Sequence, residues 1–297
     1  MVETVMVAVD GGAASQSAMD WSLDRAARRD IRLDVITVIE PNAHPRDETE
    51  AEYRTRRESA LVSTVGLAAP SLPTQVIEKS VIYGRAADSL IQASDHCDLL
   101  VIGNHPTSLL AGMVHGTLPL QLAGQTRSTM VVVPSQWRRS GNGVVVAWDD
   151  DSSADAALLF AAAEAHDRGE PLTIVHSWKV PSAQIFDAEG AMIVFDAALE
   201  VEHNVLADAA VTVRRAYPDL VVREALEAGP AAVEVIAAAH GASLLVVGTH
   251  SRRATASFLL GSVSHSALIN MPAPVAIVPS VWEPTSLHPE LLNEDLL

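Results

Sequence analysis

The chain repeats itself: one pattern of apolar strand, small-residue loop and helix start occurs once in each half. In the first half, Gly103-Asn104-His105-Pro106 is followed by nine residues and then Gly116-Thr117. In the second half, Gly248-Thr249-His250-Ser251 is followed by nine residues and then Gly261-Ser262. The copies lie 145 residues apart. Self-similarity over such a period predicts two related folding units.

Other segments repeat in the same order, so the duplication extends beyond the loops. The apolar run that ends at Asp10 matches the run that ends at Asp149, at an offset of 139 residues. At Gly84 and Gly229 the offset has become 145, which indicates a gain of about six residues around a helix expected at Ile193–Tyr217. An insertion in a surface connection is well tolerated.

Short apolar runs rich in β-branched residues alternate with amphipathic stretches. The strands expected in the first half are Val5–Val9, Leu33–Ile39, Gln75–Val81, Leu99–Gly103 and Met130–Val133. The expected helices are Ala18–Arg29 (with Ser15 as N-cap), Arg46–Gly66, Ala86–His96 and Thr117–Ala123. This alternation predicts right-handed crossovers and one parallel sheet in each half.

The length of 297 residues allows two domains of roughly 140 residues, each with its own core. We expect a first domain at 1–137, a polar, glycine-bearing linker at 138–142, a second domain at 143–282 and a leucine-bearing acidic tail at 283–297. The fold class is therefore α/β.

Charge and cysteine content restrict the partners and the compartment. A net charge of −17 disfavours nucleic acid and anionic membranes as partners. No apolar run approaches the roughly 18 residues needed to span a bilayer. The single cysteine, Cys97, excludes an internal disulfide and fits a reducing compartment. We expect a cytoplasmic protein.

The repeated loops predict where a ligand would bind. In open parallel sheets, ligands bind at the carboxyl ends of the strands, where the strand order reverses. Here that edge would carry Asp10 and Gly103 in the first half, and Asp149 and Gly248 in the second. An aspartate after strand one can accept hydrogen bonds from a ribose hydroxyl or an adenine amino group, or it can cap the next helix. Both interpretations remain open.

These features resemble the tandem universal stress proteins, whose domains are five-stranded, Rossmann-like sandwiches with strand order 3-2-1-4-5. Nucleotide-binding members carry G-x2-G-x9-G-[ST] after strand four, and Leu259–Ser264 reproduces the end of that motif. The resemblance covers Val5–Pro134 and Val144–Pro279. It implies two tandem parallel-sheet β/α sandwiches and ATP as a ligand. The nucleotide-binding residues that it implies are Asp10, Val38, Gly103, Asn104, His105, Gly116 and Thr117 in the first half and Asp149, Gly248, Thr249, His250, Ser251, Arg252, Gly261, Ser262 and Val263 in the second.

Both copies depart from the family motif at its second glycine. That glycine lets successive backbone N–H groups face an anion. Pro106 removes one donor and fixes φ, so the first loop cannot form the same anion site. Ser251 keeps its N–H group, and Arg252 and Arg253 follow it. We therefore expect ATP in the second domain rather than the first.

The turn after strand one in the second half is acidic. Asp150 and Asp151 follow Asp149 there. They could hold Mg²⁺ beside bound phosphates, repel the phosphates, or act as helix caps. We expect no metal site of the protein's own, with Mg²⁺ arriving only together with ATP.

Three functions fit these patterns. The first is an ATP-binding regulatory module in stress response, and the second is an interaction scaffold of the same fold that no longer binds nucleotide. The third, an enzyme of a related nucleotide-binding class, has no catalytic lysine or acid/base pair to support it, although slow ATP hydrolysis remains open. The apolar fifth strands, Val131–Val133 and Val275–Val278, must be covered. The resemblance implies that they are covered by pairing of fifth strands, either between the two halves of one chain or in a homo-oligomer.

Overall fold

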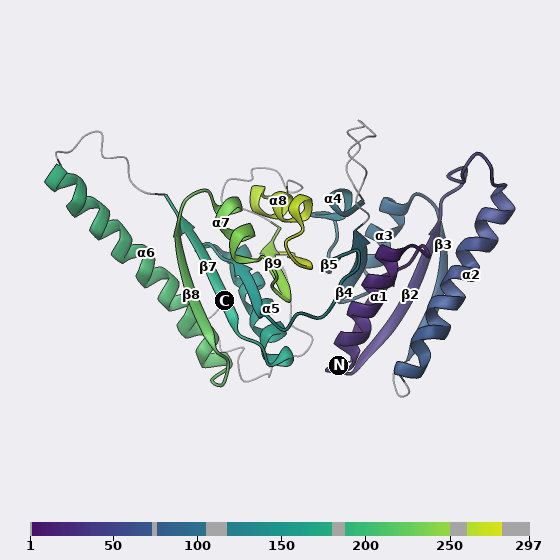
Figure 1. The fold of residues 1–297 in the computed structure, drawn as a ribbon, viewed down its shortest axis with the longest axis horizontal. Coiled ribbons are helices and arrows are strands. Elements are labelled where there is room, and N and C mark those ends of the chain that lie inside the picture. Colours follow the sequence, from purple (N-terminus) through teal and green to yellow (C-terminus); the bar gives the residue numbers. More distant parts are fainter. Residues whose placement is uncertain (1, 73–75, 105–117, 180–187, 250–259, 281–297) are drawn as a thin grey trace.

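The computed structural model describes residues 2–72, 76–104, 118–179, 188–249 and 260–280. It contains two units of the same design, set side by side (Figure 1). The first unit has strands β1 (Glu3–Ala8), β2 (Ile31–Ile39), β3 (Ile77–Tyr83), β4 (Leu99–Asn104) and β5 (Thr129–Pro134). Its helices are α1 (Ala13–Ala26), α2 (Glu50–Ala68), α3 (Ala86–Ser94) and α4 (Leu118–Leu122), with a 3₁₀ turn at Ala69–Ser71.

The second unit repeats this order of elements. Its strands are β6 (Val144–Ala147), β7 (Leu172–Trp178), β8 (Val222–Ala228), β9 (Leu244–Gly248) and β10 (Val275–Val278). Its helices are α5 (Ser152–Arg168), α6 (Ala188–Ala216), α7 (Ala231–Ala238) and α8 (Ser262–Asn270). Helices α2 and α6 lie at the two outer ends of the molecule (Figure 1).

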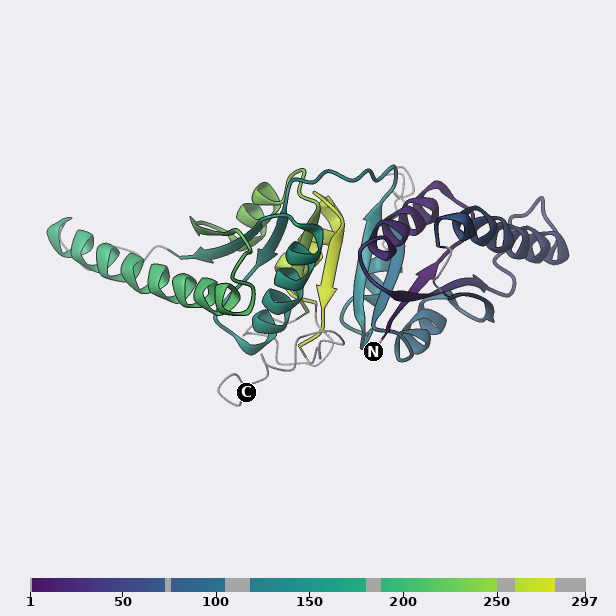
Figure 2. The same cartoon turned by 90° about the horizontal axis from the view of Figure 1, so that it is seen from below.

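The ten strands form one continuous sheet in the order β3-β2-β1-β4-β5-β10-β9-β6-β7-β8. Each unit therefore has the expected order 3-2-1-4-5. The two separate sheets that we expected are joined, because β5 and β10 pair antiparallel, with Val131 opposite Ala276. These two strands run side by side at the centre of the molecule (Figure 2). Pairing of the fifth strands within one chain is thus confirmed.

Helices cover both faces of the sheet and form two cores. Side chains from α1, α2, α5 and α6 contribute to one core, around the fully buried Trp21. The other core contains Leu90 of α3, Leu122 of α4, Val235 of α7 and Leu268 of α8. No helix within the described ranges combines the length and apolar character needed to cross a membrane.

Helix starts differ from the sequence expectations, for local reasons. Helix α1 begins at Ala13 rather than Ala18, and its N-cap is Gly12. The predicted cap, Ser15, lies inside the first turn, where its hydroxyl donates to the Gly12 carbonyl over 2.9 Å. Helix α2 begins later than predicted, after a capping box in which Thr49 and Glu52 bond each other's backbone N–H groups.

Candidate functional site

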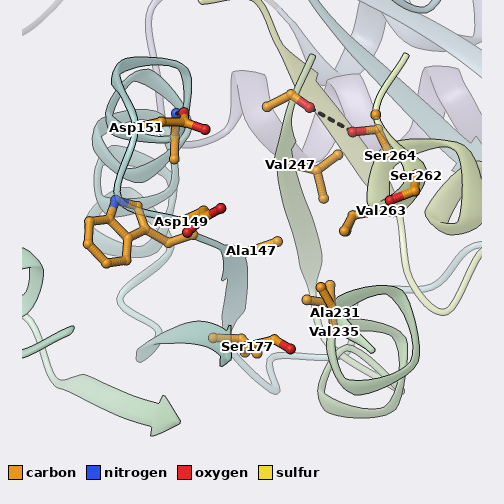
Figure 3. Close-up of a pocket in the computed structure, with 15 residues that line it drawn as sticks. Ala147, Asp149, Asp151, Ser177, Ala231, Val235, Val247, Ser262, Val263 and Ser264 are labelled. Carbon is orange, nitrogen blue, oxygen red and sulfur yellow. Dashed lines mark hydrogen bonds between the residues drawn. The ribbon is translucent and has the colours of Figure 1, made fainter. Parts of the chain in front are cut away.

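A cavity of about 120 Å³ lies at the carboxyl edge of the sheet in the second unit. The ends of β6, β7 and β9 form its floor, and the first turns of α7 and α8 form its sides (Figure 3). The lining residues are Ala147, Trp148, Asp149, Asp151, Ala154, Val175, Ser177, Ala231, Val235, Val247, Gly248, Gly261, Ser262, Val263 and Ser264. This is the edge where the sequence predicted a ligand.

The floor of the cavity is apolar and built from small side chains. Val175 on β7 and Val247 on β9 come from strands on either side of β6, and Val235 comes from α7. Each is almost fully buried. Ser177 connects β7 to the turn that follows β8, because its hydroxyl donates to the Gly229 carbonyl over 2.8 Å. A flat aromatic ligand could contact this surface through its face.

The start of α8 supplies backbone N–H groups to the same cavity. Gly261 is its N-cap, with extended backbone (φ −61°, ψ 156°) and no side-chain capping bond. The Ser264 hydroxyl donates to the Gly248 carbonyl over 2.6 Å, which fixes the helix against the end of β9. A helix N-terminus that lies in a cavity favours an anionic group there.

Carboxylates lie on the side of the cavity opposite Ser262 and Val263 (Figure 3). Asp149 accepts a hydrogen bond from the Asp150 N–H group over 3.0 Å. Asp151 accepts one from the Ala154 N–H group over 2.9 Å, so it acts as the N-cap that the sequence left open. Burial, together with the charges of Asp150 and Asp151, raises the pKa of Asp155. Within the described ranges, no three or more His, Cys, Asp or Glu side chains converge to hold a metal.

Behind this turn, a buried histidine connects the strand ends to α6. His176 Nδ1 lies 3.1 Å from the Trp148 carbonyl oxygen, and its Nε2 lies 2.9 Å from a Glu202 carboxylate oxygen. The rings of Trp148 and His176 meet edge to face, with centroids 5.7 Å apart. These contacts hold the residue that precedes Asp149.

In the first unit, an arginine occupies the position that corresponds to Glu202. Arg57 of α2 donates to the Asp10 carbonyl over 3.1 Å and to the Val38 carbonyl over 2.9 Å. Its guanidinium also lies 3.9 Å from the Asp10 carboxylate, which accepts a bond from the Gly12 N–H group. Asp10 and Val38, both predicted to face adenosine, are therefore brought together by a protein side chain.

The first unit also has larger side chains at the positions that line the cavity of the second. Ala8 is in register with Ile36, as Ala147 is with Val175. The same equivalence places Leu90 at the position of Val235, Ile102 at that of Val247 and Val38 at that of Ser177. Ile36, Leu90 and Ile102 are each 2% exposed. Each exchange adds carbon atoms on the side that corresponds to the cavity.

Gly103, predicted to lie near phosphates, has a packing role in the structure. A Cβ atom at this position would lie 2.2 Å from the Ala14 carbonyl oxygen of α1. The end of β4 thus approaches the first turn of α1 so closely that only glycine fits. This packing alone accounts for a glycine at that position.

The structure brings together part of the predicted set. Asp149, Gly248, Gly261, Ser262 and Val263 all line the second-unit cavity. Thr249 lies next to it, where its carbonyl accepts a bond from the Gly261 N–H group over 3.3 Å. Asn104 ends β4 opposite Pro134. The remaining predicted residues lie outside the described ranges: His105, Gly116, Thr117, His250, Ser251 and Arg252.

Sequence reasoning missed the apolar floor and the pair Arg57 and Glu202. A signal for both was present in the duplication itself. Placing one half on the other aligns Val175 with Ile36 and Glu202 with Arg57, and shows a smaller residue in one case and an opposite charge in the other. Comparing the halves residue by residue would have identified them.

Comparison with known proteins agrees with this architecture. A family model described as the universal stress protein family matches residues 1–134 and 142–279. Universal stress protein Rv1996 of Mycobacterium tuberculosis is 26% identical over 297 residues, covering 92% of this chain and 94% of the relative. Universal stress protein Rv2005c of the same organism is 24% identical over 286 residues, covering 92% and 96%. A crystal structure of a universal stress protein from Archaeoglobus fulgidus has a TM-score of 0.67 and 16% identity, over 93% of this chain and 98% of that chain, which is a similarity of fold.

Proposed function

Because this chain belongs to the universal stress protein family, we propose that it is an ATP-binding regulatory module of the stress response in the cytoplasm. In this proposal the second unit holds the nucleotide. The observation that supports it best is the second-unit cavity, which combines an apolar floor with the N-terminus of α8. Those are the two surfaces that an adenine base and a phosphate group require.

The orientation of the nucleotide follows from the positions of these surfaces. The adenine ring would lie on Val175 and Val247, with Val235 at its edge. The ribose hydroxyls would donate to Asp149, and the phosphates would extend towards the backbone N–H groups of Ser262 and Val263. By resemblance to the family motif, Ser251 and Arg252 would be further phosphate contacts.

Electrostatics makes the phosphate end of this site dependent on local cations. The chain has a net charge of −17, and Asp149 and Asp151 line the cavity. Mg²⁺ bound to the phosphates would offset that repulsion. We therefore propose Mg·ATP rather than free ATP as the bound species.

We propose binding without efficient turnover. Among the described residues that line the cavity, the ionisable side chains are Asp149 and Asp151. Each already accepts a backbone N–H bond that fixes the turn before α5. Such carboxylates are poorly placed to activate an attacking water, so bound ATP would act by setting a conformation or an assembly state.

The first unit supports the alternative function, a scaffold of the same fold. Larger side chains stand at its corresponding positions, and Arg57 bonds the strand ends. Pro106 in its loop removes one of the backbone donors that an anion would use. In this proposal the first unit supports and pairs with the second and binds no nucleotide.

Thermal unfolding in the presence of Mg·ATP, Mg·ADP, AMP and adenosine tests the proposal. A ligand at about 100 times its dissociation constant adds about 2.7 kcal/mol to the free energy of unfolding. We expect ATP to raise the melting temperature and to be recovered intact from the sample. If none of the four ligands shifts the transition at millimolar concentration, the scaffold function is correct for both units.

A further inference from the structure

Where the two units join, a side chain of the first unit contacts a side chain of the second. Arg25 of α1 and Glu164 of α5 occupy equivalent positions, since both pairs Val5–Leu33 and Val144–Leu172 align at the same offset of 139 residues. Their guanidinium and carboxylate groups contact each other directly. A residue that contacts its own equivalent lies on the two-fold axis that relates the units.

Both groups of this axial pair are withdrawn from water. The two side chains are each 2% exposed. Arg25 uses its remaining donors on Glu3 of its own unit, with bonds of 3.0 Å from Nε and 2.8 Å from Nη2. Its Nη1 group is directed at Glu164, in the opposite unit. The Nη1 group therefore has a carboxylate partner only when one faces it across the axis.

Further cations surround Glu164. Arg168 of the same helix lies 3.4 Å from its carboxylate, and Arg29 of the first unit lies 3.6 Å from it. Burial alone would raise the pKa of Glu164, but Arg25, Arg29 and Arg168 hold it well below its usual range. The Trp21 ring lies near both Arg25 and Arg168, with its centroid 5.8 Å and 5.5 Å from the two guanidinium carbons.

The sheet itself does not distinguish one unit from the other. At the axis, Val131 of β5 lies opposite Ala276 of β10, and both are apolar residues in equivalent positions. Backbone bonds between antiparallel edges would form equally well between two copies of β5 or two copies of β10. Any preference for mixed pairing must therefore come from side chains, and among the described residues the charged ones that meet on the axis are those of Arg25 and Glu164.

The same two-fold symmetry shows which side chains would meet if two first units, or two second units, were paired with each other. Two first units joined in the same way would place Arg25 against Arg25, and two second units would place Glu164 against Glu164. Glu3 and Arg168 would still pair with these groups inside each unit, but two like charges buried against each other across an interface oppose association. Only the mixed pairing places opposite charges on the axis.

We propose that the axial pair Arg25–Glu164 is a recognition element for unit pairing. Because of this pair, the edge of the first unit that carries β5 associates with a second unit and not with another first unit. The partner that fits this face is therefore a second-unit face, from the same chain or, when chains associate through these strands, from another copy. Homo-oligomers that pair like units through β5 or β10 are excluded.

Cleavage of the linker in the folded chain tests this directly. A protease site placed between Arg139 and Asn142, in an exposed segment, would leave the two units held by their interface alone. After dissociation in urea and joint refolding, native mass spectrometry counts mixed and like dimers. We expect mixed dimers in at least about tenfold excess over like dimers, because like charges cost several kcal/mol. A random distribution, in which half of the dimers are mixed, would overturn the proposal.

A neutral variant separates charge from shape. Arg25→Gln combined with Glu164→Gln removes both axial charges, and like dimers should then appear beside mixed ones. The control, Arg32→Gln with Glu78→Gln, removes an exposed pair elsewhere on the first unit and should leave the parent excess of mixed dimers unchanged. If the neutral axial variant still forms mixed dimers alone, another contact determines the pairing.

A double-mutant cycle in the intact chain gives an independent result that needs no separated units. Arg25→Gln and Glu164→Gln are measured singly and together by urea unfolding. Each substitution changes the unfolding equilibrium constant by some factor in the parent chain. In the chain that already carries the other substitution, this factor should be at least about tenfold smaller. Independent effects of the two substitutions would contradict a direct axial interaction.

Discussion

The two units share a fold, yet the same edge of the sheet is built differently in each. In the second unit, Val175, Val235 and Val247 leave a cavity of about 120 Å³ beside the start of α8. In the first unit the corresponding side chains are larger, namely Ile36, Leu90 and Ile102. The first unit has a cavity of about 350 Å³ as well, but it lies between the Asp10–Gly12 turn and α2, lined by Tyr53, Arg56 and Arg57. In a duplicated fold, changes of single carbon atoms can therefore decide whether this edge of the sheet keeps space for a ligand.

A second difference concerns charge at one helical position. Arg57 in the first unit bonds the carbonyls of Asp10 and Val38, whereas Glu202 in the second bonds His176, behind the cavity. Both contacts fix the ends of strands one and two, but only Arg57 uses the backbone of residues predicted to face adenosine. At this helical position the first unit therefore has a side chain that bonds its own strand ends, whereas the strand ends of the second unit line a cavity.

The largest expected effect comes from making the units alike at their junction. Glu164→Arg places a second buried cation opposite Arg25, and breaking a buried pair in this way costs about 3–5 kcal/mol of unfolding free energy. Urea unfolding measures this loss. The control, Glu200→Arg on the exposed surface of α6, should change stability little. Equal losses in the two variants would show that the junction does not depend on opposite charges.

The junction should also weaken in acid. The pKa of Glu164 is lower in the folded chain than its ordinary value of 4.5, so its stabilising contribution is complete above about pH 4.5 and decreases as the pH falls further. Glu164→Gln removes this titration, and its unfolding free energy should decrease less steeply below that pH than that of the parent chain. Parallel pH profiles of the two proteins would contradict the role assigned to this carboxylate.

Giving the cavity a side chain from the first unit should reduce ATP affinity. Val235→Leu introduces the residue found at Leu90, and overpacking or loss of cavity space typically costs 1–3 kcal/mol, or about tenfold or more in affinity. Isothermal titration calorimetry measures this change. Val233→Leu makes the same exchange at a position that is 59% exposed on the same helix. If both variants bind ATP equally well, the nucleotide lies elsewhere.

The reverse exchange in the first unit should affect stability alone. Ile102→Val removes one methyl group from a packed position, which costs about 0.5–1.5 kcal/mol. Thermal unfolding measures the loss, and calorimetry should give the parent ATP affinity. A changed affinity would mean that the first unit takes part in binding.

The smallest effect concerns the loop after β9. Ser251→Gly restores the residue that the family motif has at its second glycine. It should tighten ATP binding by at most about fivefold, since a serine in left-handed geometry costs about 1 kcal/mol. Unchanged affinity would show that this turn requires no such geometry.

Much of the fold could be predicted because duplication and alternating apolar runs are long-range signals. The two units and their alternating strands and helices followed from them, whereas the strand order and the pairing of the fifth strands came from the resemblance to the universal stress proteins. The first residues of the helices were harder to predict, since Gly12 caps α1 without a side-chain hydrogen bond. The start of α2 was predictable in principle from the spacing of Thr49 and Glu52.

The candidate site was also predictable from the sequence only in part. Asp149, Gly248 and Gly261 were predictable, because each follows a strand or precedes a helix within the repeated motif. The apolar floor was not, since a buried valine in a strand has the same local pattern whether it faces a core or a cavity. Its significance depends on the side chains around it, and these come from three separate strands and a helix.

The central claim is that the two units have diverged so that only the second binds ATP. Calorimetric titration of the intact chain with Mg·ATP gives the number of sites directly. We predict one ATP per chain, with binding weakened by Val235→Leu and unaffected by Ile102→Val. Two equivalent sites per chain, or one site that responds to Ile102→Val and not to Val235→Leu, would contradict the account.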